Sequence, residues 1–199
     1  MIEAWFPTPI YNTKLEGEDL ELMQEEMLGV FAKEKDNFKK NPHWQRDQHS
    51  VTDFTFEKNI LDDHACENAY RQISKHVVNY LSGLGLDPSL VPDFKITASW
   101  LTSTKEHEYT RRHSHGHVDI AGVYWVQTTG EDGELYFVSP NQLVRQGYMF
   151  QRIPFLQNVT PEVGTMMLWP GHLEHGVNFN TSPNERVSLS FNVLIKQVY

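Results

Sequence analysis

The stretch RRHSHGHVDIAGVYW, residues 111–125, decides the fold class. Its first half places His113, His115, His117 and Asp119 on alternate positions, and alternate residues of a β-strand share one face. Its second half, IAGVYW, is continuously apolar, which is typical of a buried strand. The stretch therefore predicts two strands of a β-protein, and one strand face that is rich in metal-ligand side chains.

The same two-residue period continues on both sides of this stretch. Strands separated by turn residues are predicted at FKITASWLT (94–102), DIAGVYWVQT (119–128), GEDGELYFVSP (130–140), GYMFQRI (147–153), GTMMLWP (164–170) and RVSLSFNVLIKQV (186–198). Many short strands with turn signals between them favour a β-sandwich or a β-barrel.

The first half of the chain has a different period. Apolar residues recur at spacings of three and four in EDLELMQEEMLGVFAKEKDNF (18–38) and in ILDDHACENAYRQISKHVVNYLSGLG (60–85), which predicts two amphipathic helices. A chain of 199 residues suits one hydrophobic core. We therefore expect a single mainly β (α+β) domain over residues 1–199, with a helical prelude at about 18–85 and a β core at about 94–198.

Composition excludes several classes of protein. Lys and Arg total 17 against 26 Asp and Glu, and the resulting net charge of −9 argues against a nucleic-acid partner. The single cysteine, Cys66, allows no intramolecular disulfide. No apolar run approaches the roughly 18 residues of a membrane span, and the first residues do not resemble a secretory signal. We expect a cytoplasmic protein without a membrane partner, acting on a small molecule or on a side chain of another protein.

A third histidine far along the chain strengthens the case for a metal site. His175 follows a strand and a Pro-Gly turn, and Arg186 begins the last predicted strand. A guanidinium binds a carboxylate through two parallel hydrogen bonds, and the hydroxyl of Ser188, which has the same parity, can donate another. The pattern indicates a metal centre beside a carboxylate-binding arginine.

These segments together resemble the 2-oxoglutarate- and Fe(II)-dependent oxygenases, and within them a family of phage and bacterial proteins with an H-x-H core. The resemblance rests on HSHGHVDIAGVYWV, GELYFVSP, GTMMLWPGHLEHGV and ERVSLSFN, and on the opening WFPTPIYNTKL. Two residues depart from the family pattern, since Gly116 replaces a proline and Ala121 replaces a serine. The resemblance implies a double-stranded β-helix (jelly-roll) barrel with iron at its open mouth.

The resemblance also implies a role for each site residue. His113, His115 and His175 would hold Fe(II), while Arg186 and Ser188 would hold the distal carboxylate of 2-oxoglutarate. Dioxygen would take a remaining position on the iron, and the reaction would yield succinate, carbon dioxide and a hydroxylated substrate. Tyr124 is expected in the cosubstrate pocket and Tyr109 is a further candidate for it, with core packing as the alternative for both. Trp100 is also a candidate for that pocket, but we expect it to pack in the core.

The choice of ligands on the first strand is open. A carboxylate ligand would lower the charge of the metal site, so His115 with Asp119, or His117 with Asp119, are alternatives to His113 with His115. The chain must turn before the apolar strand that begins at residue 120, and this favours the earlier pair. Asp119 would then be free to orient a ligand imidazole. His172 is the alternative to His175.

A second function also fits the histidines. A cupin-like enzyme with three histidine ligands, such as a dioxygenase or an isomerase, would not use 2-oxoglutarate. The Arg186-x-Ser188 pair distinguishes the two functions, because a cupin mechanism does not require it. The two helices are expected on the outside of the barrel, where they would also be in a position to support a homodimer.

Overall fold

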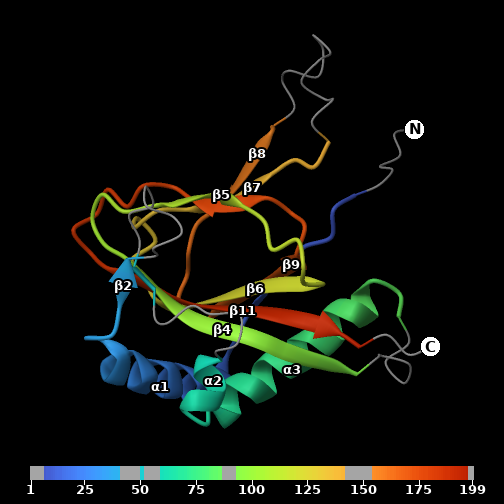
Figure 1. Cartoon of the computed structure of the whole chain (residues 1–199), viewed down its shortest axis with the longest axis horizontal. Helices are drawn as coiled ribbons and strands as arrows, with labels where there is room; N and C mark the ends of the chain where they lie inside the picture. Colours follow the sequence, from blue (N-terminus) through green and yellow to red (C-terminus); the bar gives the residue numbers. More distant parts are fainter. Residues whose placement is uncertain (1–6, 41–49, 52–58, 87–92, 142–153, 197–199) are drawn as a thin grey trace.

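Two antiparallel sheets form the framework of the protein (Figure 1). The computed structural model describes residues 7–40, 50–51, 59–86, 93–141 and 154–196. The larger sheet has the order β1 (Tyr11–Lys14), β9 (Thr165–Pro170), β6 (Ile120–Gln127), β11 (Arg186–Ile195), β4 (Phe94–Thr104), β3 (Ser50–Val51) and β2 (Lys39–Lys40). The smaller sheet has the order β5 (Thr110–His113), β10 (His175–Val177), β7 (Leu135–Val138) and β8 (Leu156–Val159).

The chain passes back and forth between the two sheets from β4 onward. β4, β6, β9 and β11 lie in the larger sheet, while β5, β7, β8 and β10 lie in the smaller one. This alternation confirms the predicted double-stranded β-helix. One detail of the prediction is wrong, because the two sheets face each other without closing into a barrel. The strand predicted at residues 147–153 lies outside the described residues, and β8 was not predicted.

β11 is the central strand of the larger sheet, and its two faces differ. It pairs with β4 from Arg186↔Thr104 to Ile195↔Phe94, and with β6 on its other side. Its apolar face packs in the core toward the helices, through Val187, Leu189, Phe191 and Val193. Gly122 of β6 is required beside this face, because a Cβ there would overlap the ring of Phe191. The opposite face of β11 is polar and points between the sheets.

In the described part of the chain, three helices cover the outer face of the larger sheet: α1 (Gly17–Glu34), α2 (Ile60–Asp63) and α3 (Glu67–Gly83). The prediction of one helix over 60–85 is wrong, because the backbone of Ala65 takes a left-handed φ of 50° and separates α2 from α3. The first turn of α3 is capped from α1. The carboxylate of Glu26 accepts hydrogen bonds from the backbone N–H groups of Asn68 (3.1 Å) and Ala69 (2.7 Å), which have no partner within the helix.

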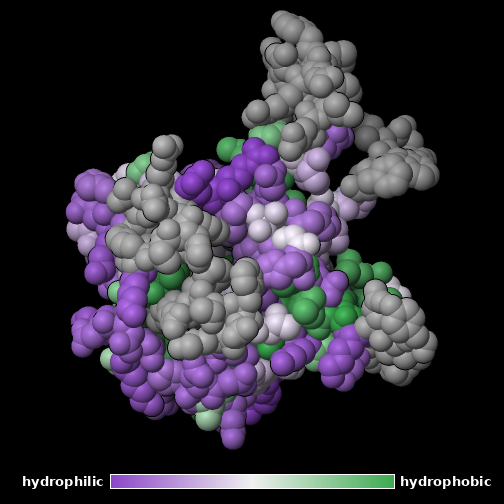
Figure 2. Space-filling view, viewed as in Figure 1, coloured by the Kyte–Doolittle hydropathy of each residue, from purple (hydrophilic) through white to green (hydrophobic). Residues whose placement is uncertain are grey.

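The helices and the larger sheet share one hydrophobic core. Met23 and Met27 of α1 and Ile73 and Val77 of α3 are fully buried in it against residues of β6, β9 and β11. The opposite side of α1 is mostly hydrophilic where Figure 2 shows it, at the lower left. A second, smaller apolar cluster lies between the two sheets. Among the described helices, none has the length and apolar character that crossing a membrane requires.

Candidate metal centre

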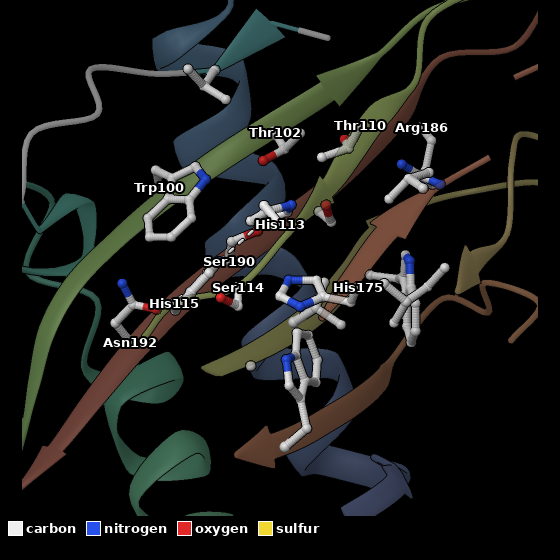
Figure 3. Close-up of a pocket in the computed structure, with 18 of the residues that line it drawn as sticks. Trp100, Thr102, Thr110, His113, Ser114, His115, His175, Arg186, Ser190 and Asn192 are labelled. Carbon is white, nitrogen blue, oxygen red and sulfur yellow. Dashed lines mark hydrogen bonds between the residues drawn. The ribbon is translucent and has the colours of Figure 1, made fainter. Parts of the chain in front are cut away.

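Three histidines from the smaller sheet and its connections come together between the sheets (Figure 3). His113 ends β5, His115 follows two residues later, and His175 begins β10. One ring nitrogen of each residue lies within 4.8 Å of the others. The ring centroids of His113 and His175 are 4.3 Å apart, and that of His115 is 5.1 Å from each of them.

Backbone pairing brings the two ligand-bearing segments together. His113 and His175 are directly opposite each other in the β5–β10 ladder. Beyond the end of β5, the N–H of His115 donates to the carbonyl of Gly171 (2.7 Å), and the N–H of Gly171 donates to the carbonyl of Asp119 (2.9 Å). A Cβ on Gly171 would collide with the carbonyl of Val118, so the close approach of the two segments requires glycine at this position.

Each of the three imidazoles has an oxygen acceptor on the side away from the cluster. Nδ1 of His113 lies 2.8 Å from the carbonyl of Arg111, and Nδ1 of His175 lies 2.9 Å from the carbonyl of Leu173. Nδ1 of His115 lies 2.6 Å from Oδ1 of Asn192 on β11. Since these oxygens only accept hydrogen bonds, each Nδ1 carries the hydrogen. Nε2 of each ring is therefore the nitrogen available to a metal ion.

The remaining contact within the cluster fits a bound cation. Nε2 of His113 and Nε2 of His115 are 3.2 Å apart. Two ligands at right angles on metal–nitrogen bonds of roughly 2.1 Å would be about 3 Å apart. Burial, and next the charges of His113 and His115, hold the pKa of His175 well below its ordinary value. Burial likewise lowers the pKa of His115. Both rings are neutral at pH 7, which suits metal binding.

The alternative ligands lie apart from this cluster. Asp119 is exposed, and its Oδ2 accepts a hydrogen bond from the backbone N–H of Ile195 (2.7 Å). It does not contact a ligand imidazole, and the side chain that orients His115 is Asn192 instead. His117 is exposed at the rim of the pocket, and His172 is exposed on the turn before β10.

Arg186 is a fully buried cation in the same pocket. Its Nη1 donates to the carbonyl of Gly133, and its Nη2 donates to Oγ1 of Thr104 (3.1 Å). Burial lowers the pKa of Arg186 to about 10, although the charge of Asp132 acts in the other direction, so the guanidinium remains protonated at neutral pH. Its Nε has no hydrogen-bond partner among the described residues. A buried donor without an acceptor is costly, and an anionic ligand would satisfy it.

The pocket between the sheets has a volume of about 320 Å³ and joins the histidines to the arginine. Figure 3 shows Asn192 and His115 toward one end and Arg186 toward the other, with His113 and His175 between them. Three tryptophans line it, and Nε1 of Trp169 is a second buried donor without a partner in the described part of the chain. The described lining residues include Trp100, Thr102, Thr110, Val123, Trp125, Leu135, Trp169, Val177, Ser188 and Ser190.

Two predictions about aromatic residues are wrong. Tyr124 is buried on the opposite face of β6, where its hydroxyl donates to Oε1 of Gln24 in α1 (2.8 Å), and its neighbour Trp125 lines the pocket instead. Trp100 was expected in the core, but it lines the pocket, with its ring centroid 6.0 Å from that of His115. Tyr109 packs against Phe179 outside the described lining.

The sequence did not single out two further polar residues that β11 contributes to the pocket. Ser190 and Asn192 line it together with Arg186 and Ser188. The signal was present, because all four residues have the same parity on β11, but parity alone does not show which of them contacts a ligand.

The fold and the cluster define a class: a double-stranded β-helix protein with three converging histidines, a donor set that is able to hold one metal ion. Residues 98–192, which include the three histidines and Arg186, match the family model described as "Putative 2OG-Fe(II) oxygenase". This match identifies the segment as similar to the 2-oxoglutarate- and Fe(II)-dependent oxygenases, non-haem iron enzymes whose cofactors are Fe(II) and 2-oxoglutarate.

Solved structures of several such enzymes are similar in fold. A prolyl-4-hydroxylase from Pseudomonas putida is 11% identical, with a TM-score of 0.61 over 95% of this chain and 94% of that one. HygX from Streptomyces hygroscopicus, solved with nickel and 2-oxoglutarate bound, is 11% identical, with a TM-score of 0.58 over 95% and 83%. EctD from S. alaskensis, solved with bound Fe, is 14% identical, with a TM-score of 0.61 over 94% and 73%. No curated protein matches the sequence.

Proposed function

We propose that this protein is an oxygenase in which His113, His115 and His175 hold Fe(II) and Arg186 binds the distal carboxylate of 2-oxoglutarate. One observation carries the proposal: a single pocket contains three converging imidazoles and a buried guanidinium with an unused N–H. A metal ion satisfies the imidazole lone pairs, and a dicarboxylate that reaches from the metal to Arg186 satisfies the guanidinium.

The protein's own residues have distinct tasks in this proposal. The carbonyls of Arg111 and Leu173 and the amide of Asn192 fix the tautomer of the three ligands. Arg186, with Ser188 beside it on the same face of β11, orients the cosubstrate. The three tryptophans surround the centre with apolar surface and limit its access to water. Bound iron supplies the activation of dioxygen, and the protein supplies position and shelter.

The overall reaction consumes one 2-oxoglutarate and one dioxygen for each C–H bond that becomes a C–OH bond. One oxygen atom enters succinate, formed with carbon dioxide from 2-oxoglutarate, and the other enters the substrate. We propose a small molecule or a protein side chain as that substrate. Two of the similar structures illustrate these kinds of substrate. One is a prolyl-4-hydroxylase, and the other is EctD, which was also solved with 2-oxoglutarate and 5-hydroxyectoine.

A cupin-like enzyme with three histidine ligands is the competing function, and the all-imidazole cluster favours it as much as the first. Arg186 favours the oxygenase over this alternative. A cupin mechanism gives no reason to bury a guanidinium at one end of the pocket with an unsatisfied Nε. Burying a donor that has no acceptor is unfavourable unless a ligand compensates for it.

Turnover tests the proposal directly. The Fe(II)-loaded protein, given 2-oxoglutarate in air, is expected to release succinate slowly even without its substrate, and to stop when the iron is removed with a chelator. Succinate is measured by mass spectrometry, with [¹³C]2-oxoglutarate to exclude contamination. Absence of succinate, together with oxygen uptake that does not depend on 2-oxoglutarate, would favour the cupin-like function.

A further inference from the structure

Two groups of the protein accept hydrogen bonds from the guanidinium of Arg186. One is the hydroxyl of Thr104, which accepts from Nη2 at 3.1 Å, and the other is the carbonyl of Gly133, which accepts from Nη1. Thr104 lies directly opposite Arg186 in the β4–β11 ladder and is 0% exposed. Neither Thr104 nor Gly133 is among the described residues that line the pocket. Any effect of these groups on a ligand must therefore act through Arg186.

The carbonyl of Gly133 is itself fixed by its loop. Asp132, which is 0% exposed, accepts hydrogen bonds from Oγ1 of Thr128 (2.6 Å) and from the backbone N–H of Thr129 (2.7 Å). Gly133 has a φ of +95°, and a Cβ there would lie 2.5 Å from the carbonyl oxygen of Asn178. The buried carboxylate of Asp132 also acts electrostatically on Arg186.

These contacts leave one part of the guanidinium for a ligand. The two terminal nitrogens are each anchored to the protein, whereas Nε has no partner among the described residues. An arginine side chain has many rotamers. Holding it in one of them beforehand reduces the side-chain entropy that would otherwise be lost when a ligand binds. Both anchors act on the same planar group, so together they set its position as well as its orientation.

We propose that Thr104 is a positioning residue for Arg186: its hydroxyl holds the guanidinium where it meets the far carboxylate of a dicarboxylate cosubstrate, and so sets the affinity for that cosubstrate. This inference rests on the proposed function, since it takes Arg186 as the group that binds 2-oxoglutarate. Thr104 contributes nothing to the metal or to the part of the cosubstrate that lies at the metal. Its effect is therefore specific to ligands with a distal carboxylate.

The test compares two ligands on the Fe(II)-loaded protein without oxygen. 2-Oxoglutarate has a distal carboxylate, whereas oxalate has only the group that chelates the metal. Thr104→Val keeps the shape of the side chain and removes the hydroxyl, and Thr104→Ser keeps the hydroxyl as the matched control. Titration calorimetry is expected to show binding of 2-oxoglutarate about tenfold weaker in T104V and close to wild type in T104S. Oxalate binding and iron content should be unchanged in both variants.

Each other outcome has a definite meaning. Equal weakening of oxalate and 2-oxoglutarate in T104V would show a general structural effect and overturn the inference, as would unchanged binding of 2-oxoglutarate. If T104V does not fold, T104A carries the same test, because it removes the same hydroxyl without adding a methyl group. R186A separates the two proposals: loss of 2-oxoglutarate binding in R186A but not in T104V rejects only the role of Thr104, whereas unchanged binding in R186A rejects the role of Arg186 itself.

Discussion

Replacing Arg186 with alanine is expected to weaken binding of 2-oxoglutarate by about 100-fold or more, while the protein continues to bind iron. Removing one partner of a buried, charge-assisted hydrogen-bonded pair typically has an effect of this size. Arg186 is fully buried, and among the described residues no other cation lines the pocket, so no neighbour can replace it. The measurement is anaerobic calorimetry of 2-oxoglutarate binding to the Fe(II)-loaded variant, with iron content determined on the same sample.

Two matched variants separate the contributions of charge and hydrogen-bond geometry to the effect of Arg186→Ala. Ser188→Ala removes a hydroxyl on the same face of β11 and is expected to have a smaller effect, because it removes no charge. Arg186→Lys keeps the charge but not the planar fork, and is expected to recover only part of the affinity. If R186A lost iron and 2-oxoglutarate to the same extent, Arg186 would have a structural role and the assignment of the carboxylate site would fail.

Replacing His175 with alanine is expected to abolish stable iron binding, with a loss of affinity of at least about 100-fold. His175 is 5% exposed, and its ring centroid lies 4.3 Å from that of His113 and 4.8 Å from that of Trp169. Its removal leaves only two imidazoles, which is fewer than a stable mononuclear site uses. The measurement is the iron content after reconstitution with Fe(II) without oxygen and removal of free metal by gel filtration.

The controls for His175→Ala are substitutions of the residues that the sequence alone leaves as alternative ligands. His117→Ala and Asp119→Ala change exposed residues outside the cluster and are expected to retain iron. His113→Ala and His115→Ala should lose it. If Asp119→Ala alone emptied the site, the metal would recruit a carboxylate, and the three-histidine assignment would have to be abandoned.

The framework of the protein could be predicted from the sequence because its signals are local. The period-two pattern located β4, β6, β9 and β11, and the same alternation on β11 separated the polar face of Arg186 and Ser188 from the apolar face of Val187 and Leu189. The need to turn before β6 set the earlier histidines apart from Asp119. In the structure Asp119 directly precedes β6, and its carboxylate accepts a hydrogen bond from Ile195 at the end of β11, outside the histidine cluster.

Other features depend on contacts between distant segments, which periodicity does not contain. Tyr124 and Trp125 are both apolar and adjacent, and only the packing of α1 on the larger sheet decides that Tyr124 faces the helices. The contact between His115 and Asn192 joins residues 77 positions apart. The break at Ala65 follows a left-handed backbone that its residue type does not favour, so the helical pattern concealed it.

The most direct test of the account is an anaerobic titration of the Fe(II)-loaded wild-type protein with 2-oxoglutarate, followed by visible absorption and by calorimetry. If the three histidines and Arg186 form one centre, a weak charge-transfer band should appear only when iron and 2-oxoglutarate are both present, and it should saturate at one 2-oxoglutarate for each iron. A protein that binds iron but shows neither this band nor any heat of 2-oxoglutarate binding would contradict the account.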